Sequence, residues 1–76
     1  MTHVVVEQPI GSWSCSRANA DEPEPGRLVV RGVDDGHLIR TFQSEHWLRC
    51  EVRDEQGVVF WFRNERPVDA MNAVRR

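Results

Sequence analysis

The chain has 76 residues, a formal net charge of -2 and an isoelectric point near 5.9. This length predicts a single small domain over residues 1–76, and the mild acidity argues against a general nucleic-acid binder, which normally has a strongly basic face. All ten basic residues are arginine and tyrosine is absent, which excludes catalysis through a lysine Schiff base or a tyrosine acid.

The N-terminal part of the chain predicts two short strands. A run of three valines favours a strand over residues 2–8, and this strand ends at Pro9 because proline cannot donate to a ladder. Serines then alternate with Trp13 and Cys15, a period of two that predicts a strand over residues 12–17 with one buried side.

The middle of the chain predicts a loop followed by a hairpin. Residues 18–26 are acidic, rich in proline and free of large apolar side chains, so we expect an exposed acidic loop there. Residues 27–33 and 37–43 then flank Asp34-Asp35-Gly36, a turn sequence. This turn predicts a hairpin, but two-residue and three-residue closures fit it equally well.

The segment from Trp47 to Arg63 predicts the strongest hairpin of the chain. Asp54-Glu55-Gln56-Gly57 is typical of a three-residue loop with a glycine bulge, which places Asp54 opposite Val58. Side chains alternate across a strand, so this register sorts the hairpin into two faces. A four-residue loop would exchange the faces of the second strand, but it separates apolar from polar groups less cleanly.

In the favoured register one face is apolar and the other combines tryptophan with arginine. We expect the apolar face to be the core side and to hold Leu48, Cys50, Val52, Val58, Phe60 and Phe62. The opposite face holds Trp47, Arg49, Glu51, Arg53, Val59, Trp61 and Arg63.

After the hairpin, valines and a methionine recur at helical spacing from Pro67 to Arg76, which predicts a short C-terminal helix. The expected fold is therefore α+β but mostly β: a small antiparallel β-meander sheet, or a partly closed barrel, of five to six strands with this one helix. The sequence does not decide whether the helix covers the sheet or closes one end of a barrel.

No catalytic or metal-binding motif stands out. Cys15 and Cys50 are too few and too far apart in sequence for a disulfide framework or a zinc site, although a single disulfide between them stays open. His37 and His46 are more simply surface residues beside turns, and no glycine-rich phosphate loop is present. We therefore expect no enzymatic activity, no cofactor and no metal.

The tryptophan and arginine face carries the functional prediction. Stacking of arginine on tryptophan could simply stabilise the hairpin, and the helix or the 18–26 loop could cover the face as a second core. Tryptophan and arginine are also the residues most enriched at energetically dominant interface positions. We therefore expect protein binding through Trp47, Arg49, Arg53, Trp61 and Arg63.

Two functions follow from such a face. The first is a non-catalytic protein–protein interaction module: a subunit, an adaptor or a stoichiometric inhibitor such as a phage or mobile-element antagonist. The alternative is single-stranded nucleic-acid binding, with bases stacked on Trp47 and Trp61. No signal-peptide or membrane-spanning pattern occurs, so we expect a cytoplasmic protein without a membrane partner, and the small core makes a homo-oligomer such as a homodimer a further expectation.

Overall fold

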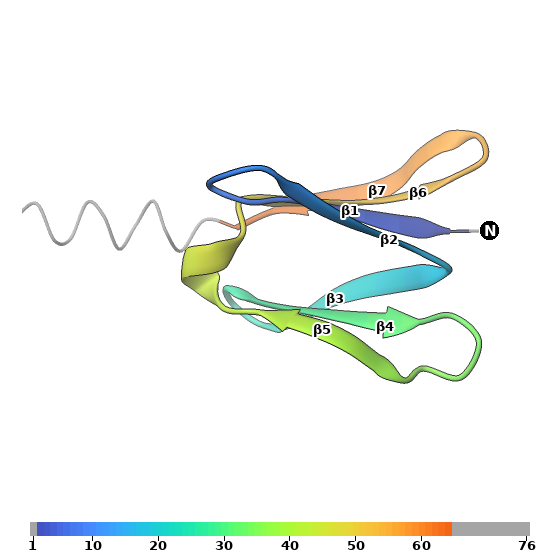
Figure 1. Ribbon diagram of the computed structural model, residues 1–76, viewed down its shortest axis with the longest axis horizontal. Helices are drawn as coiled ribbons and strands as arrows, with labels where there is room; N and C mark the ends of the chain where they lie inside the picture. Colours follow the sequence, from blue (N-terminus) through green and yellow to red (C-terminus); the bar gives the residue numbers. More distant parts are fainter. Residues whose placement is uncertain (1, 65–76) are drawn as a thin grey trace, which may run out of the picture.

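A computed structural model of the chain describes residues 2–64, which form seven antiparallel strands and one turn of 3₁₀ helix (Figure 1). The elements in chain order are β1 (His3–Glu7), β2 (Ser12–Ser16), β3 (Ala18–Glu24), β4 (Arg27–Gly32), β5 (Leu38–Phe42), η1 (Ser44–His46), β6 (Arg49–Asp54) and β7 (Gly57–Arg63).

The strands form two sheets that lie as two layers (Figure 1). One sheet has four strands in the order β2-β1-β6-β7, and the other has three in the order β3-β4-β5. The chain passes from the first sheet to the second at Arg17, which has a positive φ of 56° and pairs through its guanidinium with Asp34 at 2.9 Å. The three-stranded sheet is thus an insertion between β2 and β6.

The core lies between the two layers. The four-stranded sheet supplies small and branched side chains from every second position of β1 and β6, as the alternation of a strand requires. The three-stranded sheet adds alanines, Leu28, Val30 and Phe42. The buried residues that pack together as this core are Val4, Val6, Ala18, Ala20, Leu28, Val30, Phe42, Trp47, Cys50 and Val52.

This arrangement corrects the expected topology while keeping the mostly β, antiparallel class. The strands within residues 2–64 number seven rather than five or six, and they form two layers rather than one meander or a partly closed barrel. The sheet order is not sequential, because β1 pairs with β6. The predicted C-terminal helix from Pro67 onward lies outside the described residues.

The predicted acidic loop at 18–26 is wrong over most of its length. Residues 18–24 form β3, in which Ala18 and Ala20 are buried while Asn19 and Asp21 are exposed. Alanine is small enough to pack against β1, so this strand contributes to the core without a large apolar residue. Pro23 is tolerated because β3 is an edge strand.

The corner before β6 is fixed by polar contacts of two buried side chains. Trp47 follows η1, and its indole Nε1–H donates to the carbonyl of Gly26 at 3.0 Å, in the turn between β3 and β4. Asn64, which is 3% exposed, donates through Nδ2 to the carbonyls of Ser44 and Trp47 at 2.6 and 2.8 Å. These bonds hold the end of β7 against the η1 corner.

Candidate functional site

The register of β6 and β7 is the predicted one away from the turn. Glu51 lies opposite Trp61, and the pairs on either side of it also match the prediction, from Val52 with Phe60 to Arg49 with Arg63. Nearer the turn the prediction is wrong, because Asp54 closes on Gly57 and not on Val58. The register shift between Val52 and Arg53 absorbs the extra residue of β7 as a bulge, so the faces beyond it are unchanged.

The face of the four-stranded sheet that points away from the core contains three cross-strand rows. The pairings place Ser12, Glu7, Arg49 and Arg63 in one row, Ser14, Val5, Glu51 and Trp61 in the next, and Ser16, His3, Arg53 and Val58 in the third. We call the β6–β7 part of this surface the Arg–Trp face, defined by Arg49, Glu51, Arg53, Trp61 and Arg63. The Arg–Trp face is therefore made by neighbouring strands and does not depend on a loop.

Trp61 is 49% exposed and is held by its neighbour on β6. The guanidinium carbon of Arg49 lies 4.3 Å from the centre of the indole, a stacked cation–π contact. The carboxylate of Glu51 forms ion pairs with two guanidinium groups. Its oxygens lie 2.9 Å from a nitrogen of Arg49 and 2.6 Å from a nitrogen of Arg53. The hydrogen bond from Arg53 is the main reason why the pKa of the Glu51 carboxyl is below its usual value of 4.5.

Four of the five expected contact residues lie together on the Arg–Trp face, and one does not. Arg49, Arg53, Trp61 and Arg63 share it, whereas Trp47 is fully buried in the core. The expected exposure of Trp47 is wrong, because the chain bends at Leu48, just before β6 begins, and the strict alternation of a strand does not extend across that bend.

The predicted apolar face is buried only in its β6 half. Cys50 and Val52 belong to the core, but Leu48 and Phe60 are 37% and 42% exposed, and the bulge places Val58 opposite Arg53 on the outer face. β7 is the edge strand of the four-stranded sheet, and its main neighbour is β6. Val59 and Phe60, which neighbour each other in β7, are both exposed, as is Trp61.

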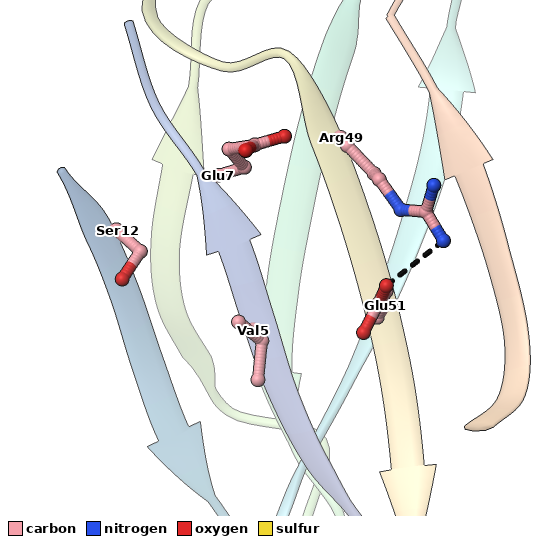
Figure 2. A pocket seen from close by; sticks show the side chains of 5 residues that line it. All are labelled: Val5, Glu7, Ser12, Arg49 and Glu51. Carbon is pink, nitrogen blue, oxygen red and sulfur yellow. Dashed lines mark ion pairs between the residues drawn. The ribbon is translucent and has the colours of Figure 1, made fainter. Parts of the chain in front are cut away.

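A shallow depression of about 430 Å³ adjoins the Arg–Trp face and is lined by Val5, Glu7, Ser12, Arg49 and Glu51. Figure 2 shows that the Arg49 guanidinium extends away from Glu7 and meets Glu51. Sequence reasoning missed the residues from β1 and β2, because only the pairing of β1 with β6 brings them here. No local sequence signal specifies that long-range pairing.

β7 differs from the other edge strands in its composition. From Val58 to Phe62 it has five consecutive apolar residues. The other edge strands carry features that discourage pairing with another chain: β3 has a proline and three acids, β5 is short with an arginine at its centre, and β2 is short and has three serines, whereas the arginine of β7 is its last residue. β7 is thus the least protected edge among residues 2–64.

The buried thiol of Cys50 is not a candidate nucleophile. Burial is the main reason why the pKa of the Cys50 thiol is raised to about 12, and both cysteines are free. Cys15 lies opposite Val4 on β2 and Cys50 opposite Val6 on β6, with β1 between them. Two strand spacings separate the two residues by roughly 10 Å, beyond the roughly 7 Å limit for a disulfide.

Residues 2–64 were also compared with the patterns of a metal site and of a membrane-spanning helix. Within residues 2–64 no three histidine, cysteine or carboxylate side chains are grouped as a metal site would require. The same part of the chain contains no helix of the length and apolarity needed to cross a membrane. Comparison with protein-family models, curated proteins and solved structures finds no match for this chain.

Proposed function

We propose that this protein is a non-catalytic protein-interaction module that binds another protein through its Arg–Trp face. The observation that carries the proposal is the half-exposed indole of Trp61, held in a fixed position on a sheet by Arg49. A large aromatic side chain gains most from being desolvated by a partner, and an arginine stacked on it can still hydrogen-bond at its rim.

The ion pairs around Glu51 lower the entropy cost of binding a partner. Glu51 is 17% exposed in its side chain and bridges Arg49 and Arg53, so both guanidinium groups are already positioned before a partner arrives. Ordering a long, free side chain at an interface costs about 0.5–1.5 kcal/mol. A face that is already ordered avoids much of that cost for two of its three arginines.

The charge of the Arg–Trp face indicates the kind of partner. Three arginines and one glutamate give it a formal charge of +2, although the whole chain has a charge of -2. Among residues 2–64 no carboxylate forms an ion pair with Arg63. The face is therefore suited to a partner surface with carboxylates around an apolar centre.

The role consistent with this proposal is occupation of another protein's surface, as a subunit, an adaptor or a stoichiometric inhibitor. The free thiols of Cys15 and Cys50 fit a reducing compartment, so we place this activity in the cytoplasm.

Binding of single-stranded nucleic acid is the second candidate, favoured by the stacking surface of Trp61 among arginines. Two observations make it weaker than protein binding. Burial of Trp47 removes one of the two expected stacking positions, and Glu51 already neutralises part of the charge that would contact phosphates.

The test begins with affinity capture of a partner protein from a lysate of the native host cells. Wild type and the Trp61→Ala variant serve as separate baits. The captured protein is then purified and its affinity for each variant is measured by calorimetry. We expect Trp61→Ala to weaken binding by about 30-fold or more, the loss of about 2 kcal/mol typical of a central interface aromatic. Circular dichroism should show that the variant keeps the wild-type fold.

Ile10→Ala is the matched control, because Ile10 is 93% exposed and lies in the turn between β1 and β2. It should leave the affinity unchanged. Equal binding by Trp61→Ala and wild type would contradict the proposal. Binding of a single-stranded oligonucleotide that falls steeply between low and moderate salt would favour the nucleic-acid function.

A further inference from the structure

The hydrogen bonding between β6 and β7 shows which residues of β7 direct their backbone N–H and C=O groups toward the open edge. The N–H of Asn64 donates to the carbonyl of Leu48 at 2.9 Å, so residue 64 belongs to the set that hydrogen-bonds to β6. In an antiparallel ladder this set includes every second residue. The N–H and C=O groups of Trp61 and Arg63 consequently point away from β6, toward the open edge.

The side chains flanking this edge define two different environments. Trp61 and Arg63 lie on the Arg–Trp face, together with Arg49. Phe60, which is 42% exposed, lies on the opposite face with Val52. A strand added to β7 would place alternate side chains in these environments, because neighbouring strands of one sheet share their faces.

The charge of the Arg–Trp face indicates whether a second copy of this chain or an acidic partner pairs with the edge of β7. A second copy paired through β7 would bring two sets of three arginines, each with a single Glu51, onto one continuous face. Like charges on neighbouring strands are destabilising, whereas carboxylates beside Arg63 and Arg49 are stabilising. The composition of the face therefore favours an acidic partner over self-association.

We propose that β7 receives an extended segment of the partner as a fifth strand of the four-stranded sheet, and that this segment alternates acidic with apolar residues. This inference rests on the proposed protein-binding function. The backbone of the segment hydrogen-bonds to Trp61 and Arg63, its carboxylates contact the guanidinium groups of Arg63 and Arg49, and its apolar side chains cover Phe60.

Hydrogen exchange read by NMR tests the backbone part of the proposal. The probe is a capped peptide of three Glu-Val repeats, and the control is a peptide with the same residues in two blocks, three glutamates followed by three valines. We expect the alternating peptide to slow exchange of the Trp61 and Arg63 amides about tenfold or more at saturation, because each gains a ladder hydrogen bond. The amide of Asn64, which is already bonded, should not change.

A reversal of charge tests the side-chain part. Arg63→Glu should weaken binding of the Glu-Val peptide about fivefold or more and should favour a peptide of Lys-Val repeats instead. Arg27→Glu is the matched control, since Arg27 lies on the other sheet and makes only an exposed contact of 4.0 Å with Glu24. It changes the net charge equally and should not change the preference.

Three results would overturn the inference. The first is absence of slowed exchange at Trp61 and Arg63 with millimolar alternating peptide, and the second is equal binding of the block peptide. The third is light scattering that finds a dimer whose Trp61 and Arg63 amides are protected without peptide, which would identify a second copy as the occupant. If the peptide fails while a captured protein still depends on Trp61, protein binding stands and only strand addition is wrong.

Discussion

Replacement of Trp47 by phenylalanine should destabilise the fold strongly, because the indole is fully buried and its N–H is bonded to Gly26. Phenylalanine leaves the buried Gly26 carbonyl without this donor, at a cost of about 1–3 kcal/mol. The smaller ring adds a cavity, which we put at about 1 kcal/mol from the cost of large-to-small core substitutions. The expected loss is therefore about 2–4 kcal/mol.

A domain of this size is stable by about 4–11 kcal/mol, so the loss should be conspicuous in urea denaturation followed by circular dichroism. Trp61→Phe is the matched control, since it makes the same chemical change at a half-exposed position and should cost less than about 1 kcal/mol through the weakened contact with Arg49. Equal destabilisation by the two substitutions would refute the assignment of Trp47 to the core and Trp61 to the surface.

Three further outcomes are expected. Asn64→Ala should lower the unfolding free energy by about 2 kcal/mol in thermal denaturation, because two carbonyls lose their donor, while exposed Asn19→Ala should have little effect. A thiol reagent should modify half-buried Cys15 in the native protein and reach buried Cys50 only after denaturant is added; fast native reaction of both would contradict the buried thiol. Because the pKa of Glu51 is lowered on folding, its stabilising contribution is present above about pH 4.5 and is lost as the pH falls through the folded pKa, so Glu51→Gln should reduce the acid dependence of stability measured by urea titration.

The parts of the structure that sequence predicted are those governed by local alternation. The strands before and after Gly11, the hairpin around Asp34–Gly36 and the pairing of Glu51 with Trp61 all follow from a period of two and from turn residues. The position of Trp61 on the outer face followed directly from that pairing, because side chains of one strand cannot change faces without a bulge.

The parts that sequence did not predict depend on tertiary context. Ala18 and Ala20 have low strand propensity, yet packing against the other layer makes them core residues of β3. The bend at Leu48 turns Trp47 inward, but residues 47–49 include no glycine or proline that would have indicated a bend. The depression beside Arg49 depends on a strand more than forty residues earlier in the chain.

That same long-range pairing affects how the protein is made. During synthesis on a ribosome, β1 emerges well before its partner β6, which begins at Arg49. β1 can therefore pair with β2 but not with β6 until the whole three-stranded insertion has been synthesised. The insertion pairs only with itself in sequence order and can assemble at once. We therefore expect a slow final step in folding, in which β6 closes this long loop by pairing with β1.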